Sequence, residues 1–280
     1  MSKEKILIVT GGGDCPGLNA VIRSIVLSSE NQSYEVYGSI NAFNGLLKSE
    51  PELIHLTKQN VKGIHSLGGT ILGTTNKGIP SQFPVKMPNG QVVYQDRMNE
   101  LVNRINEYGF TVVVNIGGDG SQRISNELQK RGINVIGIPK TIDNDLPFTQ
   151  FTFGFRTAVE IATDAVDKLS TTAASHQRVM ILEVMGRNAG WIALNTGIAG
   201  GADFILIPEL PFDLNLIEKR LNEILVDEKA FVIIVVAEGA YSKTQLIEDE
   251  DPLQLNKKAG GIGHWLMKEL ETRIDREIRL

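Results

Sequence analysis

Short apolar runs alternate along the 280-residue chain with segments in which apolar residues recur at helical spacing. The apolar runs are nearly continuous, which is typical of strands in a parallel sheet covered on both faces. Alternation of such strands with helices predicts an α/β protein. The predicted strands cover residues 6–10, 35–40, 111–116, 134–138, 178–184, 204–207 and 231–237.

Helices are predicted where apolar residues fall three and four positions apart and therefore share one face. Asp213 precedes one such stripe and is predicted to be the N-cap of that helix. Residues 78–95 contain three prolines and an Asn-Gly pair, which predicts an exposed loop or a hairpin. The apolar stripes are Met98, Leu101, Val102, Ile105 and Tyr108; Ala158, Ala162, Ala165 and Leu169; and Leu214, Ile217, Leu221 and Ile224.

The length of the chain allows a full hydrophobic core and one or two domains. A second set of strands and helices begins near Phe155. We therefore expect two domains, which cover residues 1–154 and 155–280.

Composition narrows the class of protein. The net charge of −5 predicts no broad nucleic-acid-binding surface, so anionic ligands must be met by local cations. No apolar run approaches the roughly 18 residues of a membrane helix, and the chain enters its first predicted strand without a signal peptide. The single cysteine, Cys15, excludes an intrachain disulfide and fits a reducing compartment. We expect a soluble cytoplasmic protein that binds neither nucleic acid nor membranes.

Two glycine-rich turns each follow a predicted strand and precede a helical pattern. Residues 11–17 read Gly-Gly-Gly-Asp-Cys-Pro-Gly, and residues 117–121 read Gly-Gly-Asp-Gly-Ser. Glycines let backbone N–H groups close on a phosphate, and the N-terminus of the following helix adds a positive dipole. Neither turn continues with the Gly-Lys-Ser/Thr of a Walker A loop. One such turn is weak evidence, but two turns that both carry aspartate favour a phosphate-binding site.

Residues 139–145, Pro-Lys-Thr-Ile-Asp-Asn-Asp, place a cation, a hydroxyl and two carboxylates together. They follow the predicted buried strand 134–138, and open α/β sheets bind ligands at the carboxyl ends of their strands. Phosphoryl transfer to a hydroxyl needs a base for the hydroxyl proton and positive charge for the moving phosphate. The simpler alternative is that Asp143 and Asp145 only complete a turn, for which Asp-Asn is well suited.

Taken together, these motifs resemble the 6-phosphofructokinase family. The matching segments occur in the order and spacing of that family across nearly the whole chain. They are residues 12–20, 117–121, 139–145, 176–178, 185–187 and 237–239.

The resemblance implies two similar Rossmann-like three-layer domains with mostly parallel sheets. Domain 1–154 would bind the phosphoryl donor, and domain 155–280 would bind the sugar phosphate. The implied reaction transfers a phosphoryl group from ATP to the 1-hydroxyl of fructose 6-phosphate in glycolysis, with Mg²⁺. The implied protein is a cytoplasmic homo-oligomer, either a dimer or a tetramer.

The resemblance also assigns residues. Asp143 would be the base, and the implied catalytic group also contains Lys140, Thr141, Asp145 and Arg187. The single carboxylate of Asp119 suits Mg²⁺, which usually takes one or two carboxylates together with phosphates and waters. Asp119 could instead, or in addition, cap the following helix. The donor would be bound by Gly13, Asn76, Lys77, Gly118, Asp119, Gly120 and Ser121. The sugar phosphate would be bound by Thr141, Asp143, Met185, Gly186, Arg187 and Glu238, and by Arg178 and Arg279 of a neighbouring subunit.

The choice of donor depends on Gly120 and Lys140. Pyrophosphate-dependent members typically carry Asp and Lys at these positions, whereas common bacterial ATP-dependent members carry Gly at both. Gly120 leaves the space of the nucleotide α-phosphate open, so ATP is favoured, with pyrophosphate as the alternative. Asn76 replaces an arginine that contacts ATP in common bacterial members, which predicts different nucleotide contacts.

Two further departures concern regulation and the end of the chain. Leu27 and Ser170 replace effector-binding arginines although Arg23 remains, so control by ADP or phosphoenolpyruvate is not expected. After residues 276–279 the family continues with a further sugar-phosphate motif and more helices, but this chain stops at Leu280. We therefore expect this C-terminally truncated form to be weakly active or inactive, and prone to associate. The alternative is a truncated or non-catalytic subunit that binds ligands without turnover.

Overall fold

The structure is a computed structural model that describes residues 3–32, 34–227, 230–245 and 260–280. The chain divides into two compact units. The first consists of Met1–Thr141 and Leu146–Gly154, and the second of Ile142–Asp145 and Phe155–Leu280. Residues 142–145 therefore belong with the second unit rather than with the strand that precedes them.

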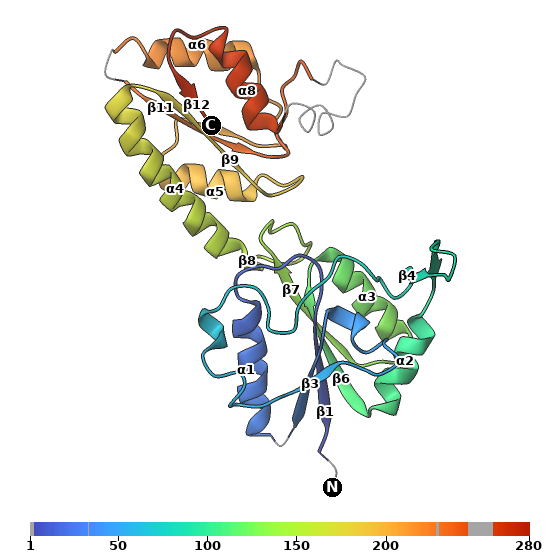
Figure 1. The fold of residues 1–280 in the computed structure, drawn as a ribbon. Coiled ribbons are helices and arrows are strands. Elements are labelled where there is room, and N and C mark those ends of the chain that lie inside the picture. The colour runs from blue at the N-terminus through green and yellow to red at the C-terminus, as the bar shows by residue number, and fades with distance from the viewer. Residues whose placement is uncertain (1–2, 33, 228–229, 246–259) are drawn as a thin grey trace. The chain divides into compact units, whose positions relative to one another are not determined.

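The first unit is built on a six-stranded sheet with the order β3-β2-β1-β6-β7-β8. All neighbouring strands are parallel except β2 and β3, which are antiparallel. Helix α1 lies on one face of the sheet, and α2 and α3 lie on the other (Figure 1). The strands are β1 (Lys5–Thr10), β2 (Glu35–Ser39), β3 (Leu53–Leu56), β6 (Phe110–Gly117), β7 (Val135–Thr141) and β8 (Phe153–Gly154).

The helices of this unit cover apolar strand surface. The main core contains Leu7 and Val9 of β1 packed with Leu101 and Ile105 of α2 and Leu128 of α3. A separate antiparallel hairpin, β4 (Phe83–Lys86) with β5 (Val92–Gln95), precedes α2. The helices are α1 (Leu18–Glu30), α2 (Met98–Glu107) and α3 (Asp119–Lys130), with short 3₁₀ helices at Ala42–Asn44 and Ile64–Ser66.

The strand order places a topological switch point between β1 and β6. The chain leaves β1 toward β2 on one side, and β6 lies on the other side of β1. Open parallel sheets bind ligands in the crevice beyond the carboxyl ends of the two strands at such a point. Both glycine-rich turns, which follow β1 and β6, therefore lie where this architecture places a ligand.

The second unit is built on a four-stranded parallel sheet with the order β10-β11-β9-β12. Its central strand β11 (Val232–Ala237) is buried along its whole length. The other strands are β9 (Val179–Val184), β10 (Phe204–Leu206) and β12 (Ile278–Arg279), and the helices are α4 (Phe155–His176), α5 (Trp191–Gly200), α6 (Leu214–Ile224) and α8 (Ile262–Glu271).

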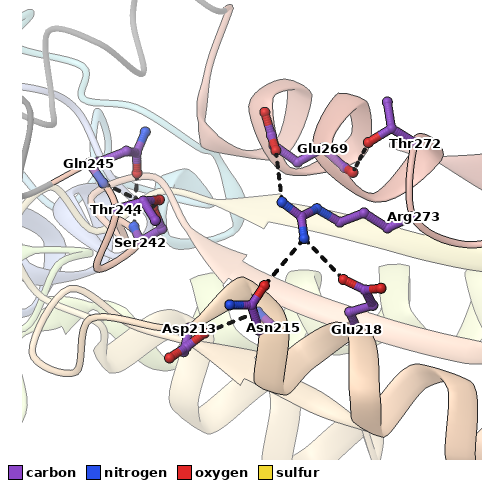
Figure 2. Close-up of polar contacts among 9 residues, drawn as sticks. All are labelled: Asp213, Asn215, Glu218, Ser242, Thr244, Gln245, Glu269, Thr272 and Arg273. Carbon is purple, nitrogen blue, oxygen red and sulfur yellow. Dashed lines mark hydrogen bonds and ion pairs between the residues drawn. The ribbon is translucent and has the colours of Figure 1, made fainter.

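Polar contacts join α6 and α8 of this unit (Figure 2). The Arg273 guanidinium, just after α8, donates to Glu218 Oε2 at 3.0 Å and to Asn215 Oδ1 at 3.3 Å, both on α6. Asp213 accepts a 3.0 Å hydrogen bond from the Asn215 N–H, which confirms the predicted N-cap. Arg273 therefore links the end of α8 to α6.

All seven predicted strands are present, with ends that differ by at most three residues, and the mostly parallel α/β class is confirmed. Residues 78–95 contain the hairpin rather than a loop. The short strands β3, β8 and β12 were not predicted, because two to four residues give too little periodicity. The predicted helix stripes lie in α2, α4 and α6, although Tyr108 is 37% exposed and lies one residue beyond α2.

One predicted strand differs in both length and burial. Strand β7 continues to Thr141, so Pro139, Lys140 and Thr141 belong to the strand and do not follow it. It is also not buried along its length, since Ile136 is 53% exposed. The reason is that residues 135–139 pair only with β6, whereas β8 joins at Lys140 and Thr141.

Candidate active site

The two glycine-rich turns of the first unit pack closely together. The Gly11 N–H donates to the carbonyl of Ile116 at 3.0 Å, which ties the end of β1 to the end of β6. A Cβ atom on Gly117 would lie 2.2 Å from Ser121 Oγ, and one on Gly11 would lie 2.6 Å from the same atom. The two turns therefore enclose Ser121, and neither position accepts a side chain without displacing it.

Lys140 brings a positive charge to the first glycine turn. Its side chain is buried, with the residue 3% exposed, and its Nζ donates to the carbonyl of Gly13. The Lys140 carbonyl lies 3.5 Å from the position of a Cβ on Gly118 in the second turn. Strand β7 thus contacts both turns, and its buried cation lies against the first of them.

The segment 74–78 forms a further wall beside the first turn. Thr74 Oγ1 donates to the Gly12 carbonyl, and the Gly12 N–H donates to the Thr75 carbonyl at 3.3 Å. Asn76 and Lys77 of this segment line a cavity of about 140 Å³ together with residues of both glycine turns. The predicted donor residues Asn76, Lys77, Gly120 and Ser121 are therefore brought together at one cavity.

Asp119 is the first residue of α3 and its carboxylate is exposed. It forms an ion pair with Arg123 at 2.9 Å. The N-cap of α3 is Gly118, so the alternative in which Asp119 caps this helix is wrong. The Asp119 carboxylate instead lies in the first turn of α3, where the helix dipole stabilises negative charge. Among the described residues no group of three or more His, Cys, Asp or Glu side chains could hold a metal ion.

Gly13 and Gly120 border open space. A Cβ added at either position would meet no atom within 4 Å. No protein atom therefore excludes a side chain at Gly13, and its predicted place beside the donor phosphate stays a prediction. At Gly120 the open space agrees with the argument that an aspartate there would occupy the place of a nucleotide.

Cys15, in the first turn, is buried and its thiol is hydrogen-bonded. Its Sγ donates to the carbonyl oxygens of Pro16 and Phe153, each at 3.4 Å. Burial raises the pKa of the Cys15 thiol to about 11, against the opposing effect of the Lys140 charge. The reactive thiolate is therefore scarce at neutral pH.

In the second unit, Asp143 is the buried member of the two predicted carboxylates. It is 9% exposed, whereas Asp145 is exposed. Arg187 Nε lies 4.0 Å from Asp143 Oδ2, and the Arg187 side chain is 79% exposed. Asn144 between the two aspartates adopts a left-handed φ of 53°, so the chain changes direction here and gives the two carboxylates different environments.

The turn that carries Arg187 is held by Glu238, the residue that follows β11. Glu238 Oε1 accepts hydrogen bonds from the N–H groups of Gly186 at 3.0 Å and Arg187 at 2.7 Å. Gly186 has a φ of 144° and Arg187 a φ of 52°, so the turn is conformationally demanding. Glu238 was predicted to bind the sugar phosphate, whereas its role in positioning this turn was not predicted.

Glycine is required beside this turn. A Cβ on Gly239 would lie 2.0 Å from the Arg187 carbonyl oxygen, and one on Gly186 would lie 2.5 Å from the Ala189 carbonyl oxygen. The segments 185–187 and 237–239, distant in sequence, therefore approach each other backbone to backbone. Met185, which begins the turn, is 62% exposed.

Arg178 and Arg279 are brought together by the pairing of β12 with β9. Both guanidinium groups donate to the carboxylate of Glu277. The hydrogen bond from Arg178 lowers the pKa of Glu277 below its usual range, with a further contribution from Arg279. The sequence analysis did not identify Glu277 as the partner of these arginines. Its position between Arg276 and Arg279 could have indicated an ion pair with an arginine.

The comparisons with known structures agree with this architecture. A phosphofructokinase from Saccharomyces cerevisiae superposes with a TM-score of 0.74 and 28% identity, over 99% of this chain and 38% of that one. A pyrophosphate-dependent phosphofructokinase from Marinobacter aquaeolei gives a TM-score of 0.76 at 22% identity, over 99% of this chain and 67% of that one. The fold is therefore that of the phosphofructokinases.

Sequence comparison then gives the family. The family profile described as Phosphofructokinase matches residues 5–280. An ATP-dependent 6-phosphofructokinase of Chloroflexus aggregans is 47% identical over 278 residues, which are 99% of this chain and 76% of that protein. ATP-dependent 6-phosphofructokinase 2 of Clostridium perfringens is also 47% identical, with the same coverage of both chains. The chain belongs to the phosphofructokinase family.

Proposed function

We propose that this protein transfers a phosphoryl group from ATP to the 1-hydroxyl of fructose 6-phosphate and so forms fructose 1,6-bisphosphate in glycolysis. The observation that carries the proposal is the cavity at the switch point of the first sheet, which is lined by residues of both glycine turns. The buried Lys140 cation donates to the first turn, and the Asp119 carboxylate belongs to the second. Membership of the phosphofructokinase family supports the reaction class, and the relatives at 40–47% identity carry ATP-dependent names.

The donor would lie in the first unit. Backbone N–H groups of Gly13, Gly118, Gly120 and Ser121 would face its phosphates, because a helix N-terminus and glycine turns offer unpaired donors. Lys140 would add positive charge, and Asn76 and Lys77 would contact the nucleotide from the opposite wall. The open space at Gly120 favours ATP over pyrophosphate, because that space accommodates an α-phosphate that carries a nucleoside.

Mg²⁺ fits the residues present. Asp119 offers one exposed carboxylate at the N-terminus of α3, and Mg²⁺ commonly uses one or two carboxylates and completes its shell with phosphates and waters. Its ion pair with Arg123 would have to open, which is cheap for an exposed pair. When bound, the ion would neutralise charge on the donor phosphates.

The acceptor would be bound by the second unit. Asp143 would take the proton of the 1-hydroxyl, a contribution on the order of 10²–10⁴-fold. Arg187, 4.0 Å from Asp143, would stabilise the negative charge that develops on the transferred group. Thr141, which is part of the first unit, would hydrogen-bond that group, and Asp145 would support the segment that carries Asp143.

The remaining contacts would fix the sugar phosphate. Met185 and Gly186 would contact the sugar, and Glu238 would accept from its hydroxyls through the carboxylate oxygen that does not hold the turn. Arg178 and Arg279 would bind the 6-phosphate of a neighbouring subunit of a cytoplasmic homo-oligomer. Within one chain both arginines pair with Glu277, so the phosphate would have to replace that carboxylate.

The test is a coupled assay of the 280-residue chain with fructose 6-phosphate, Mg²⁺ and either ATP or pyrophosphate. We expect ATP-dependent turnover that Asp143→Asn lowers by at least about 10²-fold, because the shape is kept and the proton acceptor is lost. Asp145→Asn is the matched control, because Asp145 lies two positions away and is exposed. This substitution should lower turnover far less than Asp143→Asn does. Turnover with pyrophosphate alone, or an Asp143→Asn enzyme as active as the wild type, would contradict the proposal.

A further inference from the structure

Two arginines of the second unit converge on one carboxylate. Strand β12 pairs in parallel with β9 (Figure 1), which places Arg279 opposite Met180. The Arg178 guanidinium, just before β9, donates through Nε to one carboxylate oxygen of Glu277, and the Arg279 guanidinium donates to the other. The two arginines therefore hold one anion between them, and that anion is a side chain of the same chain.

The Glu277 carboxylate indicates which kind of group this arginine pair can bind. Carboxylates and phosphates both present oxygen atoms to guanidinium groups, so the carboxylate stands in for a small oxyanion. The hydrogen bond from Arg178 holds the pKa of Glu277 below its usual range, so the carboxylate is ionised at neutral pH. A phosphate that contacts both guanidinium groups either replaces this carboxylate or lies beside its negative charge. Each of these outcomes lowers the affinity for the phosphate.

Glu277 would have the opposite effect if its main role were to hold the arginines ready for a ligand. The packing of Arg178 argues against that role, because its side chain is only 23% exposed and is restricted by the surrounding chain. The Arg178 N–H donates to the Ala173 carbonyl, and the Arg178 carbonyl accepts from the Val232 N–H, each at 3.1 Å. Loss of the Glu277 charge therefore removes a competing anion and leaves Arg178 in place.

We infer that Glu277 competes with the 6-phosphate of fructose 6-phosphate for Arg178 and Arg279, and so limits the affinity for the sugar phosphate. The inference rests on the proposed function, since that function brings the 6-phosphate bound by a neighbouring subunit to these two arginines. The arginine pair then has two states, one on Glu277 of its own chain and one on that phosphate. Exposed ion pairs are individually weak, so we expect the competition to reduce affinity by about 2–10-fold.

The test is Glu277→Gln, which keeps the shape of the side chain and removes its charge. The dissociation constant of fructose 6-phosphate is measured by calorimetry, and KM and kcat are measured in the coupled assay. We expect the dissociation constant and KM to fall by about 2–10-fold, with kcat within about twofold of the wild type. The difference between the two proteins should shrink in about 1 M potassium chloride, where the Debye length is about 3 Å.

Two controls separate this competition from a general effect of net charge. ATP is also an anion, but its proposed site lies in the first unit, so Glu277→Gln should change its dissociation constant by less than about twofold. Glu269→Gln is the matched variant, because Glu269 pairs with Arg273 at 3.7 Å and its side chain is 37% exposed, against 41% for Glu277. It removes the same charge from the same unit and should leave the affinity for fructose 6-phosphate within about twofold.

Tighter binding is a result that a purely structural role of Glu277 would not give. If Glu277 only joined β12 to β9, Glu277→Gln would weaken the binding of fructose 6-phosphate or leave it unchanged, and either result overturns the inference. A gain in affinity that Glu269→Gln reproduces, that extends to ATP, or that accompanies a change of oligomeric state in sedimentation overturns it as well.

The outcomes also distinguish this inference from the proposed function. Tighter binding of fructose 6-phosphate to Glu277→Gln, with no turnover in any of the proteins, supports the inference and contradicts the proposed reaction. Turnover by the wild type together with an unchanged affinity of Glu277→Gln supports the proposed reaction and overturns the inference. A chain that binds no fructose 6-phosphate contradicts both.

Discussion

Gly239 approaches the Met185–Arg187 turn so closely that the loss of stability caused by a side chain at residue 239 can be estimated from the geometry. A Cβ at residue 239 would lie 2.0 Å from the Arg187 carbonyl oxygen and 3.1 Å from its carbonyl carbon. Real Cβ atoms essentially never come within 3.0 Å of such atoms, so the two backbones would have to separate by about 1 Å. Both are backbone segments, and Glu238 hydrogen-bonds across the same approach.

We expect Gly239→Ala to cost about 3 kcal/mol of unfolding free energy, the upper part of the usual range for overpacking. In units of this size, a loss of about 1 kcal/mol of unfolding free energy lowers the melting temperature by about 2–4 °C. The melting temperature should therefore fall by about 6–12 °C. The displaced turn carries Arg187, and the KM for fructose 6-phosphate should therefore rise as well.

Thermal melting followed by circular dichroism measures the first effect and the coupled assay measures the second. Gly68→Ala is the matched control, because a Cβ there meets nothing within 4 Å and its φ lies outside the left-handed region. If Gly239→Ala melted within about 2 °C of Gly68→Ala, the contact between the two segments would not constrain the folded state, and the reasoning would be refuted.

Three further predictions follow from individual groups. Gly120→Asp should raise the KM for ATP sharply through overlap and like-charge repulsion with the α-phosphate, while use of pyrophosphate should suffer less; an equal loss with both donors in the coupled assay would point to a damaged turn. Glu277→Gln should lower the melting temperature at pH 7 but not in acid, because Arg178 depresses the pKa of Glu277 in the folded state, and stability from such a group is lost as pH falls through the lowered pKa. A difference between the two proteins that persists at the lowest pH would exclude this pair as its cause. Cys15 should react with a maleimide at pH 7.5 far more slowly than a free thiol, because burial raises its pKa to about 11; labelling at the rate of free cysteine would show that the glycine turn opens readily.

Several features were determined by the sequence alone because their causes are local. Apolar runs and helical stripes produce the strands and helices, and the Asp213 cap follows from residue type and position. The glycine turns after β1 and β6 were predicted because strand, turn and helix are consecutive in the chain. The resemblance of those segments to a family was sufficient to predict the family to which the chain belongs.

Other features were decided only by tertiary structure. The exposure of Ile136 depends on which strands pair with β7, and pairing is not encoded in the run that forms the strand. The positioning of Arg187 by Glu238 joins residues 51 positions apart, and the pairing of Arg178 with Glu277 joins residues 99 positions apart. Asn115 Nδ2 donates to Ser121 and Ser125, and Oδ1 has no hydrogen-bond partner in the part of the chain that the structure describes, which the residue type alone does not reveal. In each case the sequence supplies a residue type, whereas its hydrogen-bond partners and burial depend on how distant segments pack, which local periodicity does not specify.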